Sequence, residues 1–295
     1  MIWPFRRSRP GPGPSRTSQA VALTRAEFAR PHAPGGDPDA QRLLCRGMRA
    51  AVTGSQRASL AARTRFFDDQ VLAAVSAGIP QIVIVGAGYD DRALRFRSPG
   101  VDFFELDHPG TQADKAARLR AMGVRPGPGK ARRFGTPGAG PGSGGPTLAA
   151  ADFRRDDVAA ALAASGHDAG RPSLFVCEGL LVYLDQPACV RLLGALRIGA
   201  APGSRLAASL SVHRDGLDSE RVVAVANDRR RAAEAEPWLT ILPVAAHLDL
   251  LRRAGWRTAG QVDAAELGTG AEPGRSLLVT ATPVPTFRCA ATTWS

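Results

Sequence analysis

Three acidic residues and one glycine turn are the parts of this sequence best suited to hold a ligand. In the turn, Gly86-Ala-Gly88, glycine permits positive φ and lets a ligand approach the backbone. Asp107, Asp152 and Glu178 each follow a short apolar run that predicts a strand. If these strands are parallel, their carboxyl ends meet at one edge of the sheet, where α/β folds bind ligands. The pattern therefore predicts one binding site at that edge.

Asp107 has the position expected of a ribose-binding acid. It ends the second apolar run, about 20 residues past the glycine turn, where nucleotide-binding α/β folds hold ribose hydroxyls. The plain alternative for each acid is a helix cap or a solvated loop residue. Three acids together with a glycine turn favour the ligand site.

A dinucleotide such as NAD fits this turn poorly. The full fingerprint requires a third glycine, and Asp91 occupies its place. We expect the Asp91 carboxylate to repel a pyrophosphate in a partly desolvated site. An NAD-dependent oxidoreductase is therefore the less favoured hypothesis.

S-adenosyl-L-methionine, a cofactor without phosphates, matches the residue types better. Its ribose hydroxyls can donate to Asp107, and its adenine amino group to Asp152 while Phe153 covers the ring. Its amino and sulfonium groups are positive and tolerate an acidic rim, whereas its carboxylate needs a cation. The predicted cation is Arg63, on the helix before the first strand, with Arg65 as the substitute; the alternative for both is a solvated face.

The rest of the chain supplies elements that can position this site. Strands are expected at residues 81–85, 101–106, 147–151, 173–177, 205–210, 257–262 and 276–281. Helices are expected from residue 55 to just before Gly78, and at 110–122, 158–164, 186–200, 218–236 and 245–254. Strands that alternate with helices indicate an α/β fold with a mostly parallel sheet.

One domain, residues 15–283, is expected to hold these elements. Residues 1–14 and 284–295 are predicted to be tails, the first of them disordered. Glycine and proline dominate residues 125–146, which cannot bury enough apolar surface to offset their ordering entropy. We interpret that stretch as a mobile insertion.

Four motifs in this order resemble the leucine carboxyl methyltransferase family, in its bacterial S-adenosyl-L-methionine-dependent branch. They are Arg63-Thr-Arg-Phe-Phe-Asp-Asp69, Val85-Gly-Ala-Gly-Tyr-Asp-Asp-Arg92, Phe104-Glu-Leu-Asp-His-Pro109 and Cys177-Glu-Gly-Leu-Leu-Val-Tyr-Leu184. The resemblance implies a class I methyltransferase fold, a Rossmann-like sheet of seven strands with extra N-terminal helices. Asp91 departs from the pattern, because the family usually has a small hydroxyl residue there.

The resemblance also implies roles for single residues. Arg63 would meet the cofactor carboxylate, and the turn at Gly86 and Gly88 would approach its methionine part. Asp107 would take the ribose, and Asp152 with Phe153 the adenine. Glu178 would border the methionine amino group and the reaction centre.

The functional hypothesis is methyl transfer to an oxygen of a small molecule, in secondary metabolism. A carboxylate acceptor is ionised near neutral pH and needs no general base. A hydroxyl acceptor needs one, and the candidates are His108, His213 and Tyr183, each with a structural alternative. The competing hypothesis is a protein that binds the cofactor without catalysis. Neither the acceptor nor the oligomeric state can be read from the sequence.

The composition indicates which classes of partner and which cellular location to expect. The net charge of +11 invites a nucleic-acid interpretation, but the basic residues, all arginine except Lys115 and Lys130, spread along the whole chain. Four cysteines without C-x-x-C spacing argue against a zinc site or a disulfide framework, and Cys177 is expected in the core. Apolar runs are too short to span a membrane, and the first residues lack a secretory h-region. We therefore expect a cytoplasmic protein that binds neither nucleic acid nor membrane.

Overall fold

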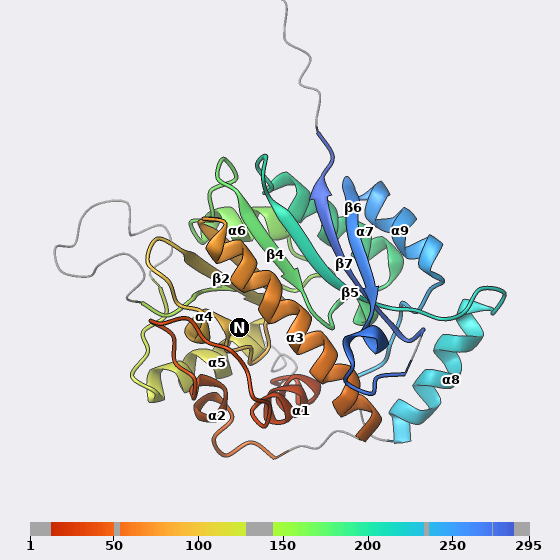
Figure 1. The fold of residues 1–295 in the computed structure, drawn as a ribbon, viewed down its shortest axis with the longest axis horizontal. Helices are drawn as coiled ribbons and strands as arrows, with labels where there is room; N and C mark the ends of the chain where they lie inside the picture. The colour runs from red at the N-terminus through yellow and green to blue at the C-terminus, as the bar shows by residue number, and fades with distance from the viewer. Residues whose placement is uncertain (1–12, 50–53, 128–143, 233–235, 273, 286–295) are drawn as a thin grey trace, which may run out of the picture.

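A computed structural model describes residues 13–49, 54–127, 144–232, 236–272 and 274–285. Its centre is a seven-stranded sheet in the order β3-β2-β1-β4-β5-β7-β6 (Figure 1). The strands are β1 (Gln81–Val85), β2 (Asp102–Asp107), β3 (Thr147–Ala150), β4 (Ser173–Cys177), β5 (Arg205–Ser211), β6 (Trp256–Asp263) and β7 (Ser276–Pro283). The first five strands are parallel, whereas β7 runs antiparallel to both β5 and β6. The predicted mostly parallel sheet of seven strands is confirmed.

The order of the strands reverses between β1 and β4. From β1 the chain moves outward to β2 and β3, and it then returns to add β4 and β5 on the other side. In the pairing register, Val85 lies opposite Leu106, and Asp107 opposite Ala150. The residues after β1, β2 and β3 therefore lie side by side at one edge, beside the switch point where open α/β sheets bind ligands.

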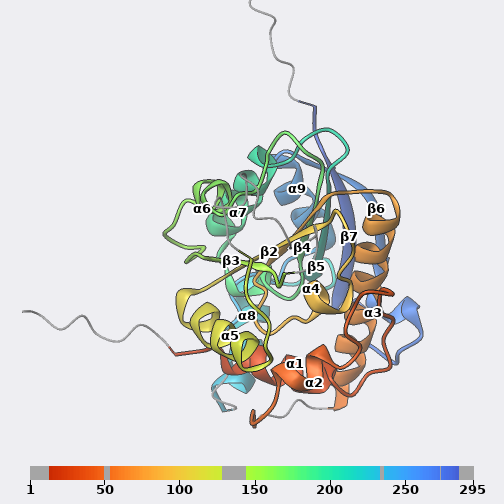
Figure 2. The ribbon, with the colours of Figure 1, turned by 90° about the vertical axis from the view of Figure 1, so that its left-hand side faces the viewer.

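Helices cover both faces of the sheet. One face packs against α3 (Gly54–Ser76), α4 (Arg92–Arg95) and α5 (Pro109–Ala121), and the other against α6 (Val158–Ala164), α7 (Gln186–Ile198) and α9 (Val244–Arg253) (Figure 2). All five residues of β1 are buried: Ile82 and Ile84 face the α3 side, while Val83 and Val85 face the α7 side. A continuous β-branched run thus serves a strand that is covered on both faces.

Three further helices lie at the end of the molecule that carries the site. They are α1 (Arg16–Arg25), α2 (Ala40–Leu44) and α8 (Ser219–Ala232), and all lie along the lower side of Figure 1. The described residues also include the short 3-10 helices η2 (Leu181–Tyr183) and η3 (Ala264–Leu267). In the described ranges no helix is both long and apolar enough to cross a membrane.

Most predicted elements agree with the structure to within a few residues. Cys177 is fully buried in the core, as expected. Two predictions fall largely outside the described residues: the tails at residues 1–14 and 284–295, and the central part of the 125–146 insertion. They stay predictions.

Candidate functional site

A cavity of ≈ 3080 Å³ opens at the carboxyl ends of the parallel strands. Its walls come from α1, α3, the residues that follow β1 to β5, and α8 with the segments on either side of it. The cavity is larger than the roughly 300–1,000 Å³ of a typical small-molecule pocket. It therefore has room for a cofactor and an acceptor together. Every predicted cofactor residue lines it: Arg63, Gly86, Gly88, Asp107, Asp152, Phe153 and Glu178.

The glycine turn and the residues after β4 meet at the switch point. Gly86 has φ +69°, and a Cβ there would lie 3.0 Å from Leu180 Cδ1. Leu180 is two residues beyond Glu178, so the two loops are in contact across the junction of β1 and β4. The turn needs glycine at this position both for its left-handed backbone and for the closeness of the neighbouring loop.

Asp107 lies at the tip of β2, beside the turn. Its Oδ2 accepts the Gly88 N–H at 2.6 Å, and its Oδ1 accepts the His108 N–H at 2.6 Å. Burial raises the pKa of Asp107, although these two hydrogen bonds oppose the shift. Each oxygen of an ionised carboxylate has two acceptor sites, so the carboxylate can still accept hydrogen bonds from a ligand.

Asp152 and Phe153 form another part of the wall, next to the tip of β3. Asp152 Oδ1 accepts the Arg154 N–H at 3.0 Å, and Oδ2 lies 3.8 Å from Arg155 Nε. The Asp152 side chain is 30% exposed. Phe153 packs against the core cluster under α7 while it also lines the cavity. A flat apolar ring beside a partly exposed carboxylate suits a base with an exocyclic amino group.

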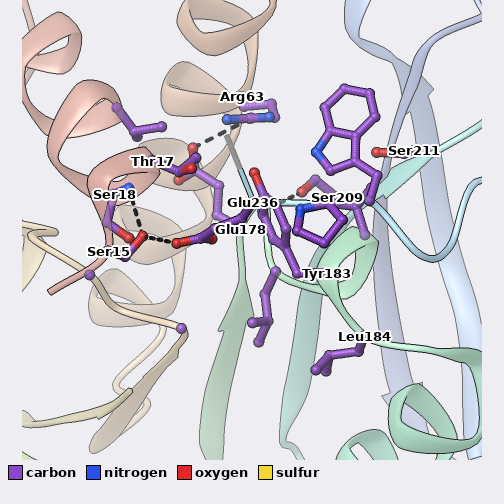
Figure 3. A pocket seen from close by; sticks show the side chains of 18 of the residues that line it. Ser15, Thr17, Ser18, Arg63, Glu178, Tyr183, Leu184, Ser209, Ser211 and Glu236 are labelled. Carbon is purple, nitrogen blue, oxygen red and sulfur yellow. Dashed lines mark hydrogen bonds and ion pairs between the residues drawn. The ribbon is translucent and has the colours of Figure 1, made fainter. Parts of the chain in front are cut away.

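Arg63 projects from α3 toward the tip of β4 (Figure 3). Its Nε is buried without a hydrogen-bond partner among the described residues, and its nearest carboxylate oxygen is Glu178 Oε1 at 3.7 Å. Arg65, the predicted substitute, is exposed and does not line the cavity, so that prediction is wrong. Residues two apart in an α-helix point to different faces.

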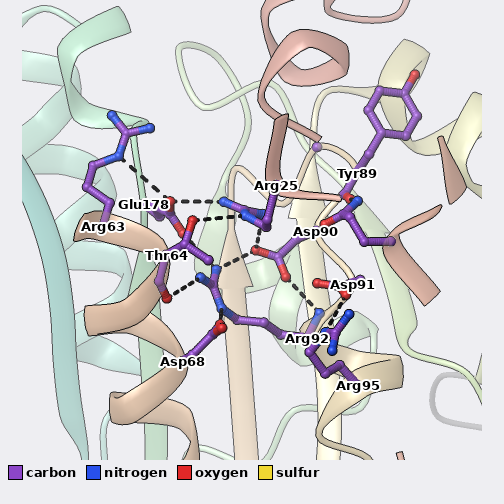
Figure 4. Close-up of polar contacts among 12 residues, drawn as sticks. Arg25, Arg63, Thr64, Asp68, Tyr89, Asp90, Asp91, Arg92, Arg95 and Glu178 are labelled. Carbon is purple, nitrogen blue, oxygen red and sulfur yellow. Dashed lines mark hydrogen bonds and ion pairs between the residues drawn. The ribbon is translucent and has the colours of Figure 1, made fainter. Parts of the chain in front are cut away.

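Glu178 belongs to a closed ring of four charges (Figure 4). Arg25 Nη2 donates to Glu178 Oε1 at 2.9 Å, and Arg92 Nη1 donates to Glu178 Oε2 at 2.7 Å. Both arginines also donate to Asp90 Oδ2, at 3.2 Å from Arg25 and 2.6 Å from Arg92. The four side chains are at most 6% exposed. The ring ties α1, the turn after β1 and the tip of β4 into one unit.

Ion pairing keeps both acids of the ring ionised. Burial alone would raise the pKa of Glu178, but the charges of Arg25, Arg92 and Arg63 prevail and lower it to about 2. Burial would also raise the pKa of Asp90, but the charges of Arg92 and Arg25 prevail and lower it below its usual range. Near neutral pH, Glu178 is therefore a fixed negative charge and a poor proton acceptor.

Asp91 does not present its charge to the cavity. It is fully buried, with Arg30 Nη1 at 2.6 Å from Oδ1 and Arg95 Nε at 2.7 Å from Oδ2. Arg30 also pairs with Asp68, which in turn accepts from Arg92. The expectation that Asp91 repels a ligand phosphate is wrong, because two arginines neutralise it on the far side of the turn.

The remaining wall, around the tip of β5, faces α8. Ser209 Oγ accepts the Gly179 N–H at 2.7 Å and fixes the loop after β4.

Among the three candidate bases, His108 caps α5, where its Nδ1 accepts the Gly110 N–H at 3.2 Å. His213 Nδ1 lies 2.8 Å from the Arg214 carbonyl and its Nε2 2.8 Å from Ser219 Oγ. All three candidates, Tyr183 included, line the cavity, and within the described residues no cluster of three potential metal ligands occurs.

The sequence did not point to Arg25 or Arg92 as part of the site. Arg92 closes the second of the four motifs and is fully buried, yet its partners at positions 68, 90 and 178 come from three separate segments. The one signal available was the excess of charged residues inside apolar patterns, since charges are buried only when they are paired.

The chain is similar in sequence to proteins of one known family. The sequence model of the leucine carboxyl methyltransferase family matches residues 19–197, more than half of the chain. A protein of Mycolicibacterium gilvum (strain PYR-GCK) named "Putative S-adenosyl-L-methionine-dependent methyltransferase" is 36% identical over 205 residues, 68% of this chain and 61% of the relative. A protein of the same name from Mycolicibacterium smegmatis is 34% identical over 236 residues, 74% of this chain and 65% of the relative. The chain thus spans less than two thirds of the length of these curated relatives.

A solved structure supports the fold. The crystal structure described as a putative methyltransferase from Thermobifida fusca YX matches 92% of this chain and 96% of that chain, with a TM-score of 0.54 and 17% identity. This likeness confirms the expected class I, Rossmann-like architecture. The family is shown by the sequence: its model matches residues 19–197, more than half of the chain, so the chain belongs to the leucine carboxyl methyltransferase family.

Proposed function

We propose that this chain is an S-adenosyl-L-methionine-dependent methyltransferase that acts on an oxygen of a small molecule. The observation that carries the proposal is the charge balance at the switch point. Arg25, Arg30, Arg92 and Arg95 pair with Asp68, Asp90, Asp91 and Glu178, so these eight buried residues are neutral in total. Arg63, with its buried Nε unsatisfied, is the surplus cation beside them.

The residues present fit this cofactor at both ends. Arg63 offers a planar guanidinium for a carboxylate, while Glu178 offers an ionised carboxylate for an ammonium group. At the adenosine end, Asp107 retains acceptor capacity for a ribose diol, and Phe153 gives an apolar surface for the base. Gly86 and Gly88, both with positive φ, line the cavity between the two ends. The names of the relatives point to the same cofactor.

When bound, S-adenosyl-L-methionine would supply a methyl group on a positively charged sulfur. The acceptor oxygen would bond to the methyl carbon as the carbon–sulfur bond breaks, and S-adenosylhomocysteine would leave as the neutral thioether. The chain's part is to orient the two molecules and to exclude water, because in-line displacement depends on positioning. Glu178 is too weak a base to take a proton from a hydroxyl near neutral pH, since its pKa is lowered to about 2. A hydroxyl acceptor would therefore depend on His108, His213 or Tyr183, which also line the cavity, whereas a carboxylate is already ionised and needs no base. We infer a carboxylate acceptor.

Calorimetric titration tests the cofactor assignment. We expect micromolar binding of S-adenosylmethionine and S-adenosylhomocysteine by the folded protein, and no binding of NADH in the control. A folded protein that binds neither sulfur compound would overturn the proposal, and binding of NADH would revive the oxidoreductase hypothesis.

Methyl transfer from labelled cofactor to a panel of carboxylic acids and phenols tests catalysis. We expect label to enter carboxylic acids that carry an apolar body, because the cavity is lined by Val222, Trp238 and Ile241 as well as by polar groups. Tight cofactor binding without transfer to any compound would favour the competing hypothesis of a binding protein.

A further inference from the structure

We propose that Arg25, on the N-terminal helix α1, is a positioning residue for the amino-acid end of the cofactor: it holds Glu178 in place and keeps that carboxylate from drawing Arg63 into a hydrogen bond. The inference rests on the proposed function and deepens it. It assigns to α1 a part in the site, although α1 is far in sequence from the residues that line the sheet edge.

Arg25 contacts three separate elements. Its Nη2 donates to Glu178 after β4 at 2.9 Å, its Nη1 to Asp90 after β1 at 3.2 Å, and its Nε to Thr64 Oγ1 on α3 at 3.4 Å. The side chain is 5% exposed, although arginine side chains are mostly exposed in folded proteins. Such a buried, three-way contact fixes the guanidinium, and with it the carboxylate that it holds.

Two arginines share Glu178, one on each oxygen. Arg92 binds Oε2, while its other nitrogens reach Asp68 and the Thr64 carbonyl, so it has no freedom to move toward Oε1. Oε1 is held by Arg25 at 2.9 Å, with Arg63 Nε farther away at 3.7 Å. Each oxygen keeps one acceptor site for an ammonium group.

Removal of Arg25 changes what Arg63 does. Oε1 then lacks its close cation, and Arg63 Nε is the donor within reach that has no hydrogen-bond partner. We expect Arg63 to turn to Glu178, because a buried carboxylate is unfavourable without a partner. The cofactor's amino group and its carboxylate would then both lose their partners.

The adenosine end makes no side-chain hydrogen bond with this ring. Asp107 is held by the N–H groups of Gly88 and His108, and none of the four ring side chains donates to it. A loss of Arg25 therefore predicts a defect confined to ligands that carry the amino-acid part.

Two ligands distinguish this role from a merely structural one. S-adenosylhomocysteine carries the amino-acid part, whereas 5′-methylthioadenosine has the same adenosine and sulfur without it. Calorimetric titration of both is made with the full chain, with Arg25→Gln, with the charge-keeping Arg25→Lys, and with Arg42→Gln as the matched control. Arg42 pairs with Asp39 on the surface, where both side chains are more than half exposed.

We expect Arg25→Gln to lower the affinity for S-adenosylhomocysteine by about tenfold or more, because a charge-assisted contact is lost. The affinity of Arg25→Gln for methylthioadenosine should stay within about twofold of the unchanged chain. The affinity of Arg25→Lys for S-adenosylhomocysteine should lie between those of the unchanged chain and Arg25→Gln. Arg42→Gln should bind both ligands as the unchanged chain does. Unchanged affinity for S-adenosylhomocysteine in Arg25→Gln, or an equal loss for both ligands, would overturn the inference. If the unchanged chain binds neither ligand, the proposed function itself fails, which is a separate outcome.

Discussion

Ser18 of α1 lies directly against Gly88 of the glycine turn. A Cβ built on Gly88 would come within 2.9 Å of both the Cβ and the Oγ of Ser18, a distance that real Cβ atoms do not reach. The N-terminal helix is therefore packed on the backbone of the turn that the cofactor is proposed to approach. Together with the Arg25–Glu178 ion pair, this contact makes α1 one wall of the site.

Gly88→Ala is expected to displace α1, and Gly78→Ala supplies a matched control. Both glycines have positive φ, +49° and +73°, but no atom lies within 4 Å of a Cβ at Gly78. Gly78→Ala should cost about 1–2 kcal/mol in the free energy of unfolding from the backbone alone. Gly88→Ala should lose more stability than this, because the new methyl group also clashes with Ser18. The displaced α1 should then be cleaved faster by trypsin after Arg25. Equal cleavage rates in the two variants would contradict the packing described above.

Asp107→Ala is expected to lower the affinity for S-adenosylhomocysteine by about tenfold or more, since it removes a proposed ribose acceptor and also leaves two backbone N–H groups without their partner. The control is Asp102→Ala, at the exposed opposite end of the same strand. Titration calorimetry measures both variants. An Asp107→Ala protein with unchanged affinity would remove the basis for the assignment of the ribose.

The fold and several residues that line the cavity could be predicted because their signals are local. The apolar run at residues 81–85 marks β1 by itself, and Asp107 follows its own strand at a spacing that α/β folds share. The glycine turn needs only its two glycines to be noticed. Each of these features depends on residues that are neighbours in the chain.

The charge network could not be predicted because its partners are remote. Arg25 meets Asp90 and Glu178, which lie 65 and 153 positions away. Nothing in the sequence says which of 36 arginines will be buried beside which acid. Asp91 was misread as a charge that faces the ligand because one of its two partners, Arg30, lies 61 positions away, although the other, Arg95, is only four residues on.

The buried side chain of His167 should make the free energy of unfolding depend on pH. His167 lies between the rings of Phe104 and Phe175, at centroid distances of 5.5 and 5.9 Å, and its Nε2 lies 2.9 Å from Ser173 Oγ. Burial lowers the pKa of His167 from 6.5 to about 4, although the charge of Asp168 opposes the shift.

The direction of the effect follows from the protons bound in each state. Between pH 6.5 and about 4 the unfolded chain holds a proton on His167 that the folded chain does not, so stability falls as the pH falls through this window. The loss should reach about 3 kcal/mol for this one group. His167→Phe keeps a ring between Phe104 and Phe175 but cannot titrate. Urea unfolding of both proteins across the window should show the unchanged chain losing stability relative to the variant, because the other acid-sensitive groups are common to both. If the stabilities of the two proteins change with pH in parallel, His167 takes up its proton at the same pH in the folded and the unfolded state, in conflict with its apolar surroundings.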